Sequence, residues 1–578
     1  MNSPFTALPD VVRQEIDHFS GQVKEYRAGT VADEQFKPFR LVHGIYGQRQ
    51  ENVQMMRIKV PGGQLSADQA RLLGQVCRDF APRKLGHVTT RQAVQLHFIP
   101  LEQVPAIWER LATVGLTSRE ACGNAIRNIT GSPVAGISGD EAFDAYPYAE
   151  AAFRYFLRRP EFSNLPRKWK MSFNGSERDY SQTAINDLGA TARVRIVDGL
   201  PQRGFRIRVG GGLGASPQDA WTWSEFVPAD RVLPLISALL MHFNLKGERK
   251  NRMAARLKFL IRKEGWETFV AEVNKILATL PETVPFPLDP ADSTVTGRVQ
   301  SPAQAPAPED GPVEYKAWKK LNTWPQVQKG YHYALVKLTL GDVTAEQWEG
   351  LADLTERFGN ATLRTSNDQN LLIPFIPSDQ LAQAYDTLRA LGLADLGPDL
   401  IGDVTSCPGA DTCNLGLVAS RGLGARLTEA LAYQDGADAD LAGTHIKISG
   451  CPNSCGQHHI GTFGFFGNVR KVDGKDAPHF QMLIGGGLNE QGASFGRVIG
   501  RVPARRAHLA VQAFVAKYRA ERREGQSLET WLRALELPVA KQVLEPFTEV
   551  VSGDPELFKD NGSEEPFKFA GVGASECA

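Results

Sequence analysis

The two halves of the sequence repeat the same order of patterns, and this repetition constrains the fold more than any other feature. The first half contains IKVPGGQLSADQARLLGQVCRDFA (58–81), GHVTTRQAVQLHFIP (86–100) and IWERLATVGL (107–116). The second half contains the counterparts VKLTLGDVTAEQWEGLADLTERFG (336–359), ATLRTSNDQNLLIPF (361–375) and AYDTLRALGL (384–393). Alternating apolar residues predict strands, and apolar residues three and four apart predict helices. Each unit should therefore run strand, amphipathic helix, strand, helix, which is typical of small ferredoxin-like units.

A segment rich in proline and alanine, 281–314, lacks apolar periodicity and separates the two halves. Each small unit leads into a longer segment of mixed strands and helices. We therefore expect an α+β protein with an internal duplication, in which two ferredoxin-like units and two larger α/β domains are related by pseudo-two-fold symmetry. The expected boundaries are 36–116 and 327–395 for the small units, 117–280 and 396–545 for the larger domains, 281–326 for the linker and 546–578 for a C-terminal tail.

Both larger segments contain a strand that ends in three glycines, FRIRVGGGLG (205–214) and FQMLIGGGLN (480–489). Gly210, Gly212 and Ala215 also fit the G-x-G-x-x-A pattern of a dinucleotide-binding loop. The residues that follow, SPQDAWTW, do not open an apolar-periodic helix, and the glycines recur in the other half. A duplicated loop in which glycine lets the backbone approach something bulky is the better interpretation.

Charge and hydropathy exclude several classes of protein. The 65 basic and 65 acidic residues balance, which argues against a nucleic-acid binder or a basic membrane-surface protein. No window approaches the ~18 apolar residues of a membrane span, and the N-terminus lacks the pattern of a signal or transit peptide. We therefore expect a cytoplasmic protein in which cysteines are reduced and grouped thiols indicate a metal site.

Four of the seven cysteines fall within one short span. Cys407 and Cys413 lie in TSCPGADTCNLG, and Cys451 and Cys455 lie in GCPNSCG. The five-residue gap in the first pair is wide for structural zinc, and the C-x-x-C-H sequence of a c-type haem is absent. Four thiolates around a [4Fe–4S] cluster tolerate such spacing. Cys577, in the tail, belongs to no pattern that we can interpret.

The two cysteine motifs together resemble those of the siroheme and [4Fe–4S] sulfite and nitrite reductase family, with ferredoxin-type sulfite reductases most similar. The resemblance extends over about 36–545 and includes the duplication. It implies that the four cysteines hold a [4Fe–4S] cluster and that Cys455 also bridges the cluster to the siroheme iron. It further implies that 117–280 binds siroheme and substrate, and that 396–545 binds the cluster and siroheme, with Asn453 as a cofactor contact.

A site for an anionic cofactor and an oxyanion needs many cations, because a buried anion without cations or donors is costly. NLPRKWKMSF (164–173) places Lys168 and Lys170 on one face of a predicted strand and Arg167 on the other. The resemblance implies that the oxyanion is bound and protonated by Arg57, Arg127, Lys168 and Lys170. It implies that the siroheme carboxylates are held by Arg91, Gln95 and Arg167. The second repeat aligns Asp368 with Arg91, so we expect one functional siroheme site.

The resemblance implies a six-electron reduction, of sulfite to sulfide or of nitrite to ammonia, with electrons from ferredoxin or a separate flavoprotein. RKWK, where plant-type nitrite reductases resemble RKWN, favours sulfite, because its higher charge gains more from a second lysine. A ferredoxin–nitrite reductase is the alternative. Two more distant alternatives are a haem-free [4Fe–4S] electron-transfer protein and a zinc-structured regulatory protein.

Overall fold

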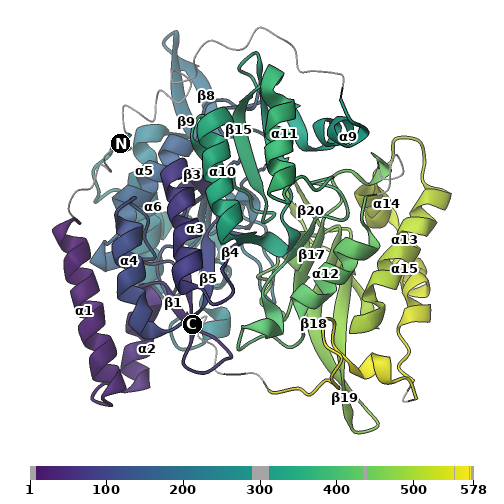
Figure 1. Cartoon of the computed structure of the whole chain (residues 1–578). Coiled ribbons are helices and arrows are strands. Elements are labelled where there is room, and N and C mark those ends of the chain that lie inside the picture. The colour runs from purple at the N-terminus through teal and green to yellow at the C-terminus, as the bar shows by residue number, and fades with distance from the viewer. Residues whose placement is uncertain (1–7, 289–310, 434–438, 552, 572, 574–578) are drawn as a thin grey trace.

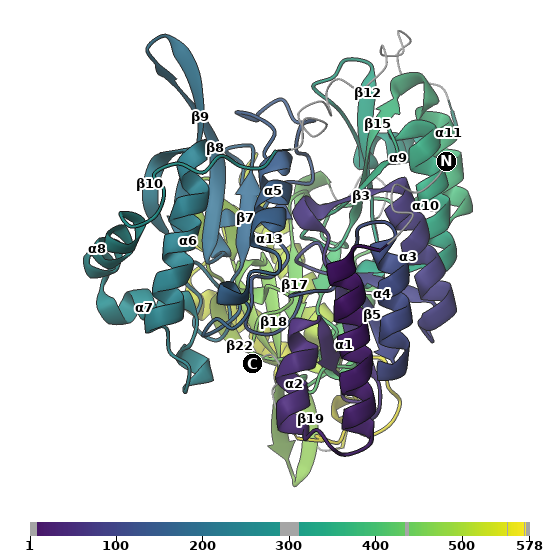
Figure 2. The same cartoon turned by 90° about the vertical axis from the view of Figure 1, so that its left-hand side faces the viewer.

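The duplicated sequence folds into two similar halves that lie against each other (Figures 1 and 2). The computed structural model describes residues 8–288, 311–433, 439–551, 553–571 and 573. Cys577 and residues 289–310 of the predicted linker lie outside the described residues. No helix among the described residues is both long enough and apolar enough to span a bilayer.

The two ferredoxin-like units have matching elements. The first contains β1 (Ile45–Gly47), β2 (Gln54–Ile58), β3 (Gln64–Ser66), α3 (Ala67–Phe80), β4 (Leu85–Val88), β5 (Val94–Ile99) and α4 (Val104–Ala112). The second contains β11 (Thr323–Pro325), β12 (Tyr331–Val336), β13 (Asp342–Thr344), α10 (Ala345–Phe358), β14 (Thr362–Thr365), β15 (Leu371–Pro377) and α11 (Leu381–Ala390). The single strand predicted over 86–100 is wrong, because a turn at Thr89–Ala93 divides it into the antiparallel pair β4 and β5.

The two units exchange a strand. Their sheets have the orders β1-β2-β5-β4-β13 and β11-β12-β15-β14-β3, so each sheet takes its last strand from the other half. The same device follows each exchanged strand: Ser66 and Thr344 form capping boxes with the glutamine three residues later. The helices α3 and α10 then pack side by side, and Gly74 allows their close approach (Figure 1). The exchange joins both units around one hydrophobic core.

The two larger domains also match. Their sheets have the orders β6-β7-β8-β9-β10 and β16-β17-β18-β19-β22. The first sheet contains β6 (Thr130–Gly131), β7 (Met171–Asn174), β8 (Leu188–Val197), β9 (Leu200–Val209) and β10 (Trp221–Pro228). The second contains β16 (Val404–Ser406), β17 (Ile446–Ser449), β18 (Phe463–Val472), β19 (Lys475–Ile484) and β22 (Arg497–Pro503). In each sheet, the first three strands are parallel, and the third and fourth strands form a long antiparallel hairpin. The predicted α+β fold with internal duplication is confirmed.

The glycine loops allow one part of the backbone to approach another. A Cβ atom on Gly211 would lie 2.4 Å from the carbonyl oxygen of Ala184, and one on Gly486 would lie 2.5 Å from that of His459. A strand, β10, and not a helix is the next element after the first loop, so the dinucleotide interpretation is wrong. The close-approach interpretation is correct, although the neighbour is the backbone of a 3-10 helix.

The linker predicted over 281–326 is too long, because α9 (Val313–Asn322) and β11 form part of the second half. The N-terminal helices α1 (Asp10–Arg27) and α2 (Asp33–Val42) were not predicted, although Ile16, Phe19 and Val23 of α1 have helical spacing and are buried.

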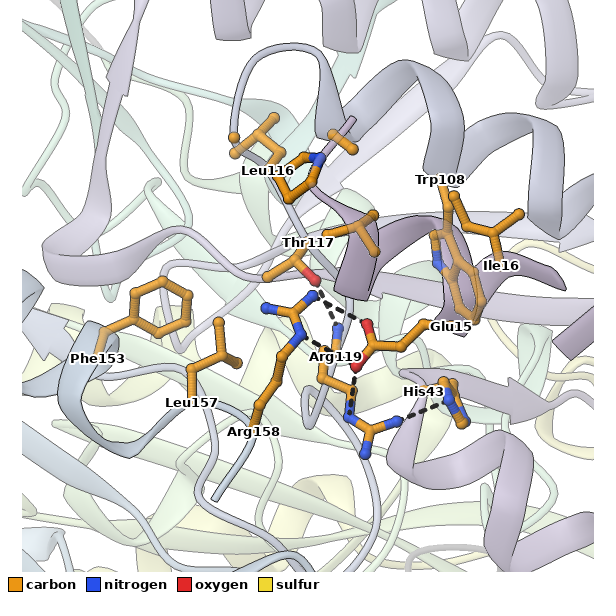
Figure 3. A pocket seen from close by; sticks show the side chains of 14 residues that line it. Glu15, Ile16, His43, Trp108, Leu116, Thr117, Arg119, Phe153, Leu157 and Arg158 are labelled. Atoms are coloured by element: carbon orange, nitrogen blue, oxygen red, sulfur yellow. Dashed lines mark hydrogen bonds and ion pairs between the residues drawn. The ribbon is translucent and has the colours of Figure 1, made fainter. Parts of the chain in front are cut away.

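An ion-pair cluster fastens α1 to the rest of the chain, and Figure 3 shows it beside a small cavity. Glu15 of α1 accepts two hydrogen bonds from Arg158, at 3.0 and 2.9 Å, and lies 3.8 Å from Arg119. Arg119 also bonds to His43, whose pKa burial lowers to about 3, so the imidazole is neutral and accepts at 2.6 Å. This cavity contains none of the predicted site residues.

Replacing Glu15 with alanine should lower the free energy of unfolding by about 1–3 kcal/mol, because two arginines lose a charged, partly buried acceptor. Glu102→Ala is the matched control: Glu102 pairs with Arg27, also of α1, but both side chains are largely exposed, so the loss should stay below about 1 kcal/mol. Chemical denaturation measures both values. Equal losses would show that the Glu15 cluster does not fasten the helix.

Candidate functional site

One cavity brings together every site residue predicted from the sequence. It contains about 1380 Å³ of space that protein atoms do not fill, open solvent at its mouth included. Its lining includes Arg57, Arg91, Gln95, Arg127, Arg167, Lys168, Lys170, Cys407, Cys413, Cys451, Asn453 and Cys455. The roles assigned to these residues stay predictions, whereas their convergence is a feature of the fold.

Strand direction explains why the cysteines meet the cations. The two cysteine pairs lie in the loops that directly follow β16 and β17, which are parallel neighbours and therefore end at the same sheet edge. Arg127 lies just before β6, and Lys170 just before β7, at the opposite edge of the other large sheet. The cavity thus forms where the carboxyl edge of one duplicated sheet faces the amino edge of the other.

The four thiols influence one another within the cavity. The amide of Gly450 donates to the sulfur of Cys407 at 3.2 Å. Burial raises the pKa of the Cys451 thiol, and the other three cysteines raise it further. A polynuclear cluster, whose iron atoms would neutralise several neighbouring thiolates, matches this donor set.

The cation-bearing segment at 167–170 is not a strand, contrary to the prediction. Trp169 makes only an isolated bridge to Ile126, and β7 begins at Met171. Arg167 lines the same cavity as Lys168 and Lys170, so the predicted opposite faces are also wrong. The alternation itself persists, because Trp169 is buried between the two lysines.

The cavity is strongly cationic. Six arginine and lysine side chains line it, and none of its described lining residues is aspartate or glutamate. Burial lowers the pKa of Lys170 well below its ordinary value, and Arg91 and Arg256 lower it further. Burial also lowers the pKa of Arg91 to about 9. Cations crowded in this way favour a bound anion, which would relieve their mutual repulsion.

Backbone carbonyl groups orient two of the arginines, Arg57 and Arg127. Arg57 and Arg127 each donate to the carbonyl oxygen of Ala121 at 3.2 Å, and Arg127 makes two further bonds to Gly123, at 3.1 and 2.8 Å. When its amide oxygen faces the guanidinium, Gln95 accepts from Arg57 at 2.9 and 2.5 Å. The loop that contains Ala121 therefore holds both guanidinium groups toward the cavity.

Three supporting residues were not predicted. Asn186 accepts from Arg91 at 2.7 Å. Asp187 is buried, pairs with Arg256 at 2.8 Å and accepts the backbone amide of Lys170 at 2.9 Å. None of the three belongs to a sequence motif, so their proximity depends on the fold. Asn186 and Asp187 lie immediately before β8, a strand that was not predicted, so no predicted element pointed to them.

The residues fit a polyanionic tetrapyrrole such as siroheme. Burial, a carboxylate-free lining and six cations suit a group with many carboxylates. The Nε atom of Arg91 is buried without an acceptor in the protein, so its N–H group is left to donate to a ligand. The four thiols in the same lining suit a [4Fe–4S] cluster.

A second, larger cavity lies at the equivalent position of the duplication, between the segments before β16 and β17 and the segment after β7. It contains about 2390 Å³ of space that protein atoms do not fill, open solvent at its mouth included. Its charges are reversed: the acidic lining residues are Asp179, Asp368, Asp399, Asp403, Glu490 and Glu529, against the cations Arg178 and Lys447. Asp368, the counterpart of Arg91, pairs with Lys447 at 2.7 Å. This cavity therefore lacks the cationic lining of the first.

Comparisons with known families match most of the chain. The family described as "Nitrite and sulphite reductase 4Fe-4S domain" matches residues 122–279 and 398–549. The family described as "Nitrite/Sulfite reductase ferredoxin-like half domain" matches residues 46–114 and 324–391. Each family thus matches once in each half.

Individual proteins give the same result. The chain is 30% identical to an assimilatory ferredoxin-dependent nitrite reductase of Haloferax mediterranei over 91% of this chain and 89% of that protein. It is 32% identical to sulfite reductase (ferredoxin) 1 of Mycolicibacterium paratuberculosis over 83% and 82%. The solved structure of Mycobacterium tuberculosis NirA protein superposes with a TM-score of 0.72 at 28% identity, over 88% of this chain and 91% of that one.

Proposed function

The chain belongs to the nitrite and sulfite reductase family, and from that premise we propose that it reduces sulfite to sulfide by six electrons. The proposed cofactors are siroheme and a [4Fe–4S] cluster, and the proposed donor is ferredoxin, the donor named in its relatives. A separate flavoprotein is the alternative donor. The observation that carries the proposal is the single cavity in which four cysteines face six cations with no acid in its described lining.

The cavity residues divide into those that would hold cofactors and those that would act on substrate. The four cysteines would bind the cluster, with Cys455 shared with siroheme. The siroheme carboxylates and rim would contact Arg91, Gln95, Arg167 and Asn453. When bound, these cofactors supply single electrons and an iron position open to the oxyanion. We also propose a cytoplasmic location, where such thiols stay reduced.

The remaining cations would bind and orient the oxyanion, namely Arg57, Arg127, Lys168 and Lys170. Because Ala121 and Gly123 fix the two guanidinium groups, their positive charge needs little reorganisation during the reaction. Because burial lowers the pKa of Lys170, its ammonium group would release a proton more readily than that of an exposed lysine. The oxyanion oxygens would receive protons from these lysines as water leaves.

The second lysine supports sulfite over nitrite, because a doubly charged oxyanion gains more from Lys170 than a singly charged one does. We expect Lys170→Asn to lower kcat/KM for sulfite by about 10²-fold or more and to lower that for nitrite much less, since removing a charged donor costs most where charge is highest. Steady-state assays of both substrates with reduced ferredoxin or a dye donor measure the ratio. An unchanged ratio would remove Lys170 as the specificity determinant.

A ferredoxin–nitrite reductase is the second candidate, favoured by the similarity to the Haloferax mediterranei nitrite reductase over 91% of the chain. Preferred turnover of nitrite by the unmodified protein would establish it and overturn the substrate assignment alone. A haem-free electron-transfer protein would show a cluster spectrum without siroheme bands, and it would not need the four substrate-side cations.

A further inference from the structure

Two equivalent glutamines meet between the duplicated domains. Gln182 precedes the 3-10 helix η4 (Thr183–Ile185), and Gln457 precedes its counterpart η11 (His458–Ile460). Both adopt the left-handed backbone conformation, with φ of 61° and 63°, and both are 7% exposed. Their side-chain amides bond reciprocally, at 3.0 and 2.5 Å. A buried amide pair satisfied in this way favours a single arrangement of the two domains.

The backbone on each side of this pair has little freedom. The two glycine loops pack directly against η4 and η11, so a Cβ atom on Gly211 or Gly486 would collide with their carbonyl oxygens. The carboxylate of Asp179 also accepts the amides of Thr183 and Ala184, at 2.7 and 3.1 Å. The glutamine pair thus joins two rigid segments and not two flexible loops.

The amide nitrogen of Gln457 connects the pair to the loop that contains Cys455. The Gln457 amide donates to the carbonyl oxygen of Thr90 at 3.3 Å, and the Thr90 hydroxyl donates to that of Cys455 at 3.0 Å. Gly456, between Cys455 and Gln457, donates to the hydroxyl of Ser449 at 3.0 Å. The peptide group that joins Cys455 to Gly456 is therefore held by hydrogen bonds at both its carbonyl oxygen and its amide.

The amide oxygen of Gln457 connects the pair to the second ferredoxin-like unit. Lys447 donates to the Gln457 amide oxygen at 3.3 Å and pairs with Asp368 at 2.7 Å. Thr90 belongs to the first ferredoxin-like unit, Gln182 and Gln457 to the two larger domains, and Asp368 to the second small unit. All four units of the duplication therefore meet in one hydrogen-bonded junction next to Cys455.

We propose that Gln182 and Gln457 are positioning residues that fix the Cys455 loop relative to the first half of the chain. This inference rests on the proposed function, in which Cys455 links the cluster to siroheme while the siroheme contacts come largely from the first half. An amide pair across the pseudo-two-fold axis would keep the thiolate at one distance and angle from the haem.

Two variants test the proposal. Gln457→Glu keeps the size and the acceptors but removes the N–H donors to Thr90 and Gln182, so packing is conserved. Gln182→Leu removes the partner from the opposite half without altering the Cys455 loop. We expect both to shift the siroheme absorption bands and to weaken the spectroscopic coupling between cluster and haem, with sulfite turnover ~10- to 100-fold lower, the loss expected from a small misplacement.

Gln326→Leu is the matched control, because Gln326 is also a buried glutamine that caps a backbone amide, that of Phe375 at 2.6 Å, but lines neither large cavity. It should leave the spectra unchanged at comparable thermal stability. Unshifted spectra in both test variants, or an equal shift in the control, would overturn the positioning role. Absence of siroheme bands in the unmodified protein would instead overturn the cofactor assignment.

Discussion

Replacing Cys455 with alanine is expected to abolish sulfite reduction, with turnover at least about 100-fold lower. Replacing a residue that only supports a metal ligand can already lower activity by up to about 100-fold. The variant should lose siroheme, or retain it uncoupled from any remaining cluster. The physical reason is that all four cysteines line the cavity where the haem is proposed to bind, but Cys455 is exposed whereas the other three are partly buried. Absorption and electron paramagnetic resonance spectra of the purified variant measure the loss.

Cys77→Ala is the control for this experiment. Cys77 is fully buried in the core of the ferredoxin-like units, where burial raises its pKa to about 12 and keeps it a thiol. Its replacement should cost some stability and leave both cofactor signals intact. If Cys455→Ala turned over sulfite at the rate of the unmodified protein, the proposed link between cluster and haem would be wrong.

Arg127→Leu should lower kcat/KM for sulfite by about 10²- to 10³-fold, the range found when one preorganised donor to a developing anion is removed. The guanidinium is buried and fixed by three hydrogen bonds to the carbonyl oxygens of Ala121 and Gly123. Arg127→Lys should recover only part of the activity, because an ammonium group cannot reproduce the planar donor geometry. Cofactor spectra of both variants should remain close to those of the unmodified protein.

Arg364→Leu offers a matched control. Arg364 is also a buried arginine that donates to two backbone carbonyl oxygens, those of Pro133 and Ala135 at 2.9 and 2.8 Å, yet it does not line the cofactor cavity. Its loss should lower stability while leaving the activity of the folded protein unchanged. An equal loss of activity in both variants would mean that Arg127 acts through stability and not on the substrate.

Patterns that depend on short-range spacing allowed the duplication and the group of four cysteines to be predicted, whereas the roles of the cations came from the family resemblance. The alternation and helical periodicity of the repeats identify the ferredoxin-like units, and the cysteine spacing indicates the loops proposed to bind the cluster. The exchange of β3 and β13 could not be predicted, because each strand has only three residues and its partner is chosen by packing between the halves.

Within the site, the sequence could not distinguish an extended loop from a strand at Lys168–Lys170, because both alternate their side chains. Nor could it identify Asp187 and Arg256, which lie far apart in the chain and meet only when the sheet and its helices are assembled. Residues that belong to a motif were predictable, whereas those that support the motif through tertiary contacts were not.

The most direct test of the account is the absorption and electron paramagnetic resonance spectrum of the purified protein, recorded with analysis of iron, acid-labile sulfide and zinc. We expect siroheme bands together with a [4Fe–4S] cluster, and a perturbation of the haem signal when the cluster is reduced. A protein containing zinc without iron, or a cluster with no haem bands, would contradict the placement of both cofactors in one cavity.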